Sequence, residues 1–223
     1  MDWFESHASG IGINDGGRCL YKKSGHKKYF NIQSKKFEIV PGSEAFIILD
    51  TYRENAPIIK NSECTVHDIG DGVMCLEFTS KSNAIGEGIG RAMDEVVRIA
   101  EEGNWKGIVI GNNGKQFSVG ANLMNVGMLA MQKQFEPLGQ MIDDFQQINM
   151  RIRTSKIPVV VATQGYVFGG GCEIAMHCDA GIYAAESYIG LVEVGVGLLP
   201  GGGGTKEFAV RASDEFFEGD VQS

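Results

Sequence analysis

The sequence predicts an α/β protein whose core is a parallel sheet, preceded by a small β-rich extension. Segments with strand-like and helix-like patterns alternate from about residue 64 onward. Such alternation is typical of parallel strands joined by right-handed helical crossovers. The chain has 223 residues, of which 43% are hydrophobic, and this is enough to bury the core of one large domain.

The N-terminal extension contains a basic segment at residues 18–37. This segment holds seven Lys or Arg residues and no Asp or Glu, and its Ser-Gly pair suits the turn of a β-hairpin. We favour a solvated hairpin face, because runs of charge usually face water; a patch that binds phosphates is the alternative. Residues 1–60 are assigned to this extension and a connector that Pro41, Gly42 and Pro57 interrupt.

The main domain is predicted element by element from hydrophobic periodicity. Strands are expected at residues 72–79, 105–112, 157–165 and 179–185, and helices at residues 86–102, at residues 138–153 and directly after the glycines at 169–171. Ligand sites in such sheets gather at the carboxyl ends of the strands. The segments GNNGKQFSVGAN and QGYVFGGGCE follow two of these strands, so we expect them to form the site.

Charge, apolar runs and motifs exclude several classes of function. A net charge of −8 argues against a general nucleic-acid-binding protein. The apolar runs are too short to span a membrane and the start does not resemble a signal peptide, so we expect a cytoplasmic protein. The five cysteines lack CxxC spacing and the four histidines are scattered. They therefore predict reduced thiols, with neither a disulfide framework nor a metal site.

Two glutamates in glycine-rich surroundings carry the remaining chemical signal. Glu173, in GGGCEIAM, lies in the first turn of a helix, where free backbone N–H groups and the helix dipole stabilise an anion. Glu193 lies among apolar residues in IGLVEVGVGLLP, which would favour a neutral carboxyl if the segment is buried. A purely structural explanation stays open for each: a favourable helix N-terminal charge for Glu173, and an exposed edge position for Glu193.

Four stretches resemble the crotonase, or enoyl-CoA hydratase/isomerase, superfamily. They are SNAI at 82–85, FSVGANL at 117–123, GYVFGGGCEIAMHCD at 165–179 and YIGLVEVGVGLLPGGGGTKE at 188–207. The resemblance is closest to the hydratase part of bifunctional enzymes that also carry a 3-hydroxyacyl-CoA dehydrogenase. It implies a crotonase-like ββα spiral at residues 61–212 and the start of a truncated helical region at residues 213–223.

The resemblance also implies a role for each matching position. The backbone N–H groups of Ala121 and Gly170 would form an oxyanion hole for a thioester oxygen. Glu173 would activate the water that attacks C3, and Glu193 would deliver a proton to C2. No metal or cofactor is implied, because coenzyme A enters as part of the substrate. The residues implied to contact the acyl-CoA are Ser82, Val119, Asn122, Leu123, Phe168, Gly169, Val192 and Gly201.

The resulting prediction is hydration of 2-trans-enoyl-CoA to 3-hydroxyacyl-CoA in fatty-acid β-oxidation. Isomerisation of enoyl-CoA is the alternative within the superfamily, but isomerases and hydrolases commonly lack one of the two carboxylates. A catalytically silent acyl-CoA-binding or docking module is the alternative from another class. The resemblance further implies a trimer-based homo-oligomer and a dehydrogenase module upstream, and Asn122 departs from it where many members have Asp.

Overall fold

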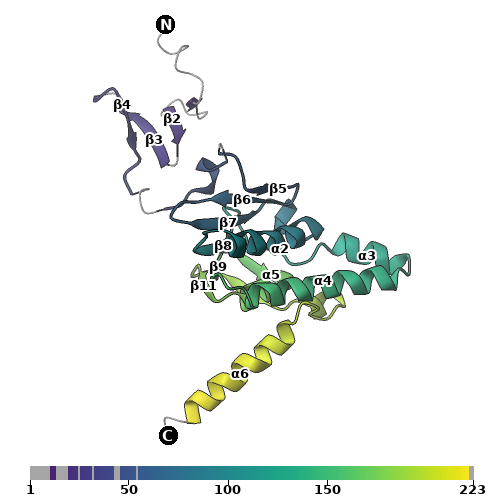
Figure 1. The fold of residues 1–223 in the computed structure, drawn as a ribbon. Helices are drawn as coiled ribbons and strands as arrows, with labels where there is room; N and C mark the ends of the chain where they lie inside the picture. Colours follow the sequence, from purple (N-terminus) through teal and green to yellow (C-terminus); the bar gives the residue numbers. More distant parts are fainter. Residues whose placement is uncertain are drawn as a thin grey trace. The chain divides into compact units, whose positions relative to one another are not determined.

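The computed structural model describes residues 11–13, 20–24, 26–31, 33–42, 46–53 and 55–220. The chain divides into two compact units, Met1–Ala56 and Pro57–Ser223 (Figure 1). Cys19, which the sequence predicts to be a reduced thiol, lies outside the described residues, as do residues 221–223 of the predicted C-terminal region. Each unit is described by itself.

The first unit contains an antiparallel sheet of short strands. β1 (Ile11–Ile13), β2 (Leu20–Ser24), β3 (His26–Asn31) and β4 (Lys36–Ile39) are hydrogen-bonded in that order, and η1 (Leu49–Thr51) follows. β2 and β3 are antiparallel, with Ser24 opposite His26, which confirms the predicted hairpin. The carboxylate of Glu38 accepts hydrogen bonds from the Tyr29 hydroxyl at 3.0 Å and from Asn31 Nδ2 at 2.8 Å. The solvated face expected for the basic segment stays a prediction, and phosphate binding stays its alternative.

The second unit is built on a six-stranded sheet in the order β11-β9-β8-β7-β6-β5. β7 (Val73–Phe78), β8 (Gly107–Gly111), β9 (Val159–Thr163) and β11 (Ala180–Tyr183) are parallel, as the sequence predicts. β6 (Cys64–Asp68) joins β7 through the short turn after Asp68, and β5 (Ile59–Lys60) pairs with β6; both pairings are antiparallel. The sheet is therefore mixed but mostly parallel.

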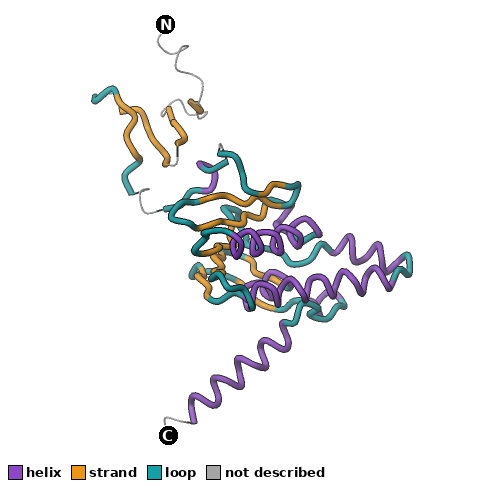
Figure 2. The backbone as a smooth tube through the Cα atoms, viewed as in Figure 1, coloured by secondary structure: helices purple, strands orange, loops and turns teal. Residues whose placement is uncertain are grey.

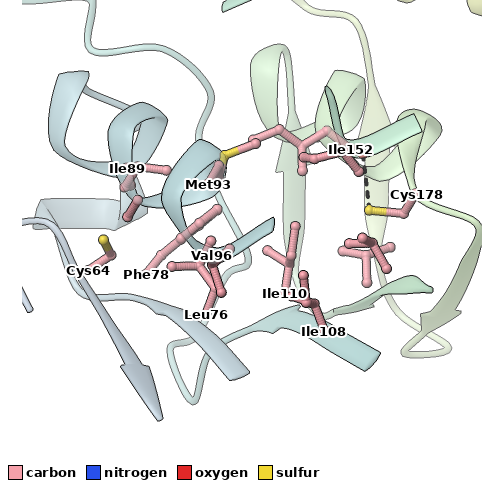
Figure 3. Packing of buried hydrophobic residues seen from close by; sticks show 14 of the residues in the cluster. Cys64, Leu76, Phe78, Ile89, Met93, Val96, Ile108, Ile110, Ile152 and Cys178 are labelled. Atoms are coloured by element: carbon pink, nitrogen blue, oxygen red, sulfur yellow. Dashed lines mark hydrogen bonds between the residues drawn. The ribbon is translucent and has the colours of Figure 1, made fainter. Parts of the chain in front are cut away.

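α2 (Glu87–Glu102) packs on this sheet because its apolar residues recur at helical spacing. The predicted stripe of this helix is at most 1% exposed: Ile89, Met93, Val96, Val97 and Ala100. Figure 3 shows part of this stripe in one cluster with the strand residues Leu76, Phe78, Ile108 and Ile110. Fully burying each such large apolar side chain contributes about 1.5–3 kcal/mol. The main core therefore lies between α2 and the sheet.

The later helices form a second group. They are α3 (Leu123–Met131), α4 (Phe135–Arg153), α5 (Gly170–His177) and α6 (Gly204–Asp220). α4 contacts α2, α3 and α5 (Figure 2), and it contributes the buried Ile152 to the core. α3 was not predicted, because none of its residues is buried and no core-facing stripe marks it in the sequence.

A second, two-stranded sheet brings the site loops together. β10 (Tyr166–Phe168) pairs in parallel with β12 (Tyr188–Gly190). An isolated parallel bridge joins Ser118 to Val167 in β10, and another joins Ile85 to Ala121. The segments SNAI, FSVGANL, GYVFGGG and YIGL, which are distant in sequence, are thus linked side by side by backbone hydrogen bonds.

Candidate active site

The glycines at the start of α5 are required by close approaches between loops. Gly169 has φ 52°, which lies in the left-handed region that favours glycine. A Cβ on Gly169 would lie 3.0 Å from Oε1 of Glu193, and a Cβ on Gly171 would lie 2.8 Å from Cβ of Ser118. The three consecutive glycines therefore let α5 begin directly against the loops that carry Ser118 and Glu193.

The two predicted oxyanion-hole amides come from neighbouring loops. A Cβ on Gly120, whose φ is 90°, would lie 3.4 Å from the backbone nitrogen of Gly170. The Gly120 carbonyl accepts from Ile85 N–H at 2.8 Å, and Asn122 N–H donates to the Ile85 carbonyl at 2.9 Å. These two bonds fix the peptide units on both sides of Ala121. Within residues 55–220, the N–H groups of Ala121 and Gly170 have no hydrogen-bond acceptor.

Glu173 is a buried carboxylate held by backbone amides. Its side chain is 2% exposed, and Oε1 accepts hydrogen bonds from Gly202 N–H at 2.8 Å and Gly204 N–H at 2.9 Å. Burial raises the pKa of Glu173, the negative charge of Glu193 adds to that rise, and the two amides oppose it. Glu173 therefore lies in the first turn of α5, as predicted, but its carboxyl is bound by a different segment of the chain.

Glu193 begins the short 3-10 helix η3 (Glu193–Val196). Its apolar neighbours are exposed, Val194 by 75% and Leu199 by 81%, so the condition of a buried segment is not met. The carboxyl of Glu193 nevertheless lies against Gly169, since a Cβ at that glycine would be 3.0 Å from Oε1. Oε2 of Glu193 is buried and has no hydrogen-bond partner in the described part of the chain. A buried acceptor without a partner is costly, which points to a ligand or water as its partner.

The SNAI turn is attached to the FSVGANL loop. Ser82 is exposed, and both Ser82 and Asn83 adopt positive φ, 56° and 53°, a strained conformation for residues with side chains. Asn83 Nδ2 donates to the Gln116 carbonyl at 2.9 Å, and Ser118 Oγ donates to the Asn83 carbonyl at 2.7 Å. Ser82 is therefore brought next to the loop that carries Val119.

The other residues predicted to contact acyl-CoA lie around the same loops. Asn122 differs from them, because its side chain caps α3. Val119, Leu123 and Val192 are exposed by 37%, 45% and 43%, and the Phe168 ring stacks on Tyr166 with centroids 4.7 Å apart. The carbonyl of Gly201 accepts from Gln146 Nε2 at 2.6 Å. Asn122 Oδ1 accepts from Met124 N–H at 3.2 Å; this side chain caps α3, which gives it a structural task.

The thiol next to Glu173 is not a reactive group. Burial raises the pKa of the Cys172 thiol to about 11, so this neighbour of Glu173 is not a thiolate nucleophile at neutral pH.

Among the described residues, no group of His, Cys, Asp and Glu could hold a metal ion. Over the same residues, no helix is long and apolar enough to cross a membrane.

Sequence reasoning missed the residues that support Glu173. They are Asn149, His177, Gly202, Gly204 and Glu207. The run of four glycines at residues 201–204 was a visible signal for the loop. The polar residues gave no signal, because a lone polar residue in a helix is usually solvated.

The fold is that of a crotonase-type protein, and two carboxyls lie beside backbone amides that have no acceptor within residues 55–220. A crystal structure of an enoyl-CoA hydratase from Polaromonas sp. JS666 is similar, with TM-score 0.62 and 27% sequence identity over 66% of this chain and 57% of that chain. The profile described as enoyl-CoA hydratase/isomerase matches residues 68–215. The chain belongs to the enoyl-CoA hydratase/isomerase family, which confirms the predicted superfamily and fold class.

Curated relatives extend beyond this chain. A Bacillus subtilis protein named "Probable 3-hydroxyacyl-CoA dehydrogenase" is 40% identical over 201 residues, which are 89% of this chain and 25% of that protein. A protein of Pongo abelii named "Enoyl-CoA hydratase, mitochondrial" is 32% identical over 137 residues, 60% of this chain and 45% of that protein. The chain therefore spans a quarter of the first relative and under half of the second.

Proposed function

We propose that this domain adds water across the double bond of 2-trans-enoyl-CoA thioesters. The observation that carries this proposal is the pair of carboxyls, Glu173 and Glu193, on either side of the glycine turn at 169–171. Family membership supports hydratase-type chemistry, and the retained pair favours hydration within the family. A carboxylate that takes a proton and a carboxylic acid that gives one are the two groups that addition of water requires.

The oxyanion hole of the proposed mechanism consists of the amides of Ala121 and Gly170. Addition at C3 moves negative charge onto the thioester oxygen, and two N–H donors aimed at that oxygen stabilise this charge more than they stabilise the substrate. Removing one such donor typically costs about 3 kcal/mol of transition-state stabilisation. The lack of acceptors for these two amides within residues 55–220 supports the assignment.

Glu173 acts as the general base in this mechanism. Its Oε1 is occupied by the amides of Gly202 and Gly204, so Oε2 is the oxygen that takes a proton from water as the water attacks C3. Glu193 then delivers a proton to C2 through its buried Oε2, for which no protein donor competes among the described residues. Atoms balance, because water gives its hydroxyl to C3 and one proton to Glu173, and Glu193 gives its own proton to C2. Transfer of the proton from Glu173 to Glu193 then restores both carboxyls.

The acyl-CoA is proposed to lie along the exposed residues around these loops. The proposed contacts are Ser82, Val119, Leu123, Phe168, Gly169, Val192 and Gly201, with Asn122 acting through its cap on α3. Coenzyme A is part of the substrate, and the mechanism uses no further cofactor. We also propose an upstream 3-hydroxyacyl-CoA dehydrogenase module, which the name of the Bacillus subtilis relative supports. The predicted trimer and the cytoplasmic location stay predictions.

The test is loss of the conjugated 2-enoyl thioester absorbance on adding the protein. Glu173→Gln and Glu193→Gln are each expected to abolish this loss, since general acid-base groups contribute about 10²–10⁴-fold. Glu186→Gln is the matched control, because Glu186 is exposed. Full activity in both site variants would contradict the assignment. Double-bond migration that survives Glu173→Gln would indicate isomerisation, and binding without turnover would indicate a silent module.

A further inference from the structure

Three polar residues on one face of α4 bind the glycine loop at residues 201–204 and the start of α6 that follows it. We call Gln146, Asn149 and Arg153 the α4 anchor; their spacing of three and four residues places them on one side of the helix. Gln146 Nε2 donates to the Gly201 carbonyl at 2.6 Å, and Asn149 Nδ2 donates to the Gly202 carbonyl at 3.0 Å. Arg153 pairs with Glu207 just after the loop.

The same glycine loop binds Glu173 from its other side. The carbonyls of the loop point toward α4, while the N–H groups of Gly202 and Gly204 bind Oε1 of Glu173. Asn149 is completely buried and Glu173 is 2% exposed. The loop is therefore a connector between α4 and the carboxylate, with no side chains of its own to fix its position.

Glu207 fixes the end of the loop to α5. Its side chain is 1% exposed, and it contacts Lys206 Nζ at 2.8 Å and His177 Nε2 at 3.6 Å as well as Arg153. His177 Nδ1 lies 2.7 Å from the backbone carbonyl of Glu173. α4 is thus linked to Glu173 by a second set of contacts. Arg153 pairs with Glu207, Glu207 contacts His177, and His177 contacts the backbone carbonyl of Glu173.

We propose that the α4 anchor holds the glycine loop so that its amides keep Glu173 ionised, which makes Asn149 and Arg153 positioning residues for the general base. This inference rests on the proposed function for its catalytic meaning. Physically, a carboxylate in a dry site is destabilised, and hydrogen bonds from N–H groups restore its charged form. If the loop moves, that support is lost and the pKa of Glu173 rises further.

Other charged groups around Glu173 also affect its protonation. Each variant below leaves all of these groups in place except the one that it replaces. Glu193 on η3 opposes ionisation of Glu173, and His177 contacts its backbone. The titratable and charged groups packed around Glu173 are Cys172, His177, Glu193, Lys206, Glu207 and Arg153.

The test replaces Asn149 with leucine, which has a similar size but no amide. Glutamate labelled with ¹³C at the carboxyl is titrated by NMR in the whole chain, and the Glu173 signal is assigned by its absence in Glu173→Gln. We expect Asn149→Leu to move the Glu173 midpoint upward by about one pH unit. The acid limb of kcat/KM is expected to move equally, so that activity below the wild-type midpoint falls about tenfold.

Matched variants separate positioning from general loss of structure. Gln147 is exposed, lies on α4 and is not part of the α4 anchor. Gln147→Leu is therefore expected to leave the titration midpoint of Glu173 unchanged. Arg153→Met is expected to raise the midpoint and Arg153→Lys to restore it, since lysine keeps the charge that faces Glu207. Arg153 is 40% exposed, so its replacement is tolerated even if Asn149→Leu does not fold.

The two readouts distinguish failure of this inference from failure of the proposed function. An unchanged Glu173 midpoint in folded Asn149→Leu, or in Arg153→Met, would overturn the inference whether or not the wild-type chain turns over enoyl-CoA. If the Glu173 midpoint is raised in the variants but the wild-type chain has no hydratase activity, the positioning role is supported and the proposed function is rejected.

Discussion

The turn into α5 and the η3 segment each bring a glycine-flanked glutamate to the candidate site, and they differ in how they do so. Every residue of α5 is buried, and Glu173 is bound by two amides from another segment. No residue of η3 is buried, and the inward oxygen of Glu193 has no partner in the described chain. The comparison teaches that a carboxyl oxygen can be buried while its apolar neighbours in sequence stay exposed, since Oε2 of Glu193 is buried and Val194 is 75% exposed.

The largest expected difference between the two regions is in stability. Ile174 of α5 is 0% exposed and Val194 of η3 is 75% exposed. Ile174→Ala is expected to lower the free energy of unfolding by about 4 kcal/mol, because it leaves a cavity in a packed core. Val194→Ala is expected to change it by less than about 0.5 kcal/mol. Urea unfolding of both variants measures this, and equal losses would show that the two regions are packed alike.

The next difference concerns glycines. A Cβ on Gly202 would contact Phe145, lie 2.6 Å from Glu173 Oε2 and lie 2.8 Å from Asn149 Nδ2, whereas a Cβ on Gly195 of η3 has nothing within 4 Å. Gly202→Ala is expected to lower kcat/KM about a hundredfold, about 2.7 kcal/mol in the barrier. Gly195→Ala, assayed with the same enoyl thioester, is expected to match wild type. A Gly202→Ala variant with wild-type kcat/KM would mean that catalysis by Glu173 does not depend on the close approach of Gly202 to its carboxyl.

A smaller effect on stability is expected from the charged groups around Glu207, which contacts His177 of α5. Burial acts to raise the pKa of Glu207, but the hydrogen bond from Lys206 and the charges of His177, Arg153 and Lys206 lower it overall. The stabilisation by Glu207 is therefore present at neutral pH and is lost as pH falls through the lowered folded-state pKa.

Glu207→Gln is accordingly expected to lower the free energy of unfolding at pH 7 by about 2 kcal/mol, because the carboxylate of the 1% exposed Glu207 loses its charge-assisted contacts with Arg153 and Lys206. Wild type and variant are expected to converge only below the lowered folded-state pKa of Glu207, where the carboxyl is protonated. Denaturant unfolding at several pH values measures the two curves. A difference that does not depend on pH would indicate lost packing instead of lost charge.

The smallest expected effect has the opposite sign. The pKa of Glu173 is raised, first by burial, so ionising this group costs stability as pH rises from its ordinary value of 4.5 toward the folded-state pKa. Glu173→Gln is therefore expected to raise the free energy of unfolding at pH 7 by about 1 kcal/mol, and this gain disappears in acid. Unfolding at pH 7 and in acid measures it. A variant less stable than wild type at pH 7 would show that the amide bonds outweigh the cost of burial.

The sequence predicted the elements whose pattern reflects burial. The stripe of α2, with Ile89 and Met93, and the apolar strand β9 are visible because each must face a core. α3 buries none of its residues, so periodicity could not mark it. β6 was not predicted because antiparallel addition to β7 depends on a short turn after Asp68, which alternation of helices and strands does not encode.

The sequence by itself determined the class of fold, the two glutamates and the glycines that let backbones approach one another, since these follow from local patterning and from motifs in a fixed order. Only the tertiary structure decided which groups surround each carboxyl. The amides of Gly202 and Gly204, the α4 anchor and the outward turn of Val194 all depend on contacts between residues far apart in the chain. Burial and hydrogen bonding of a charge are properties of those contacts, and they set whether a carboxyl holds a proton or takes one.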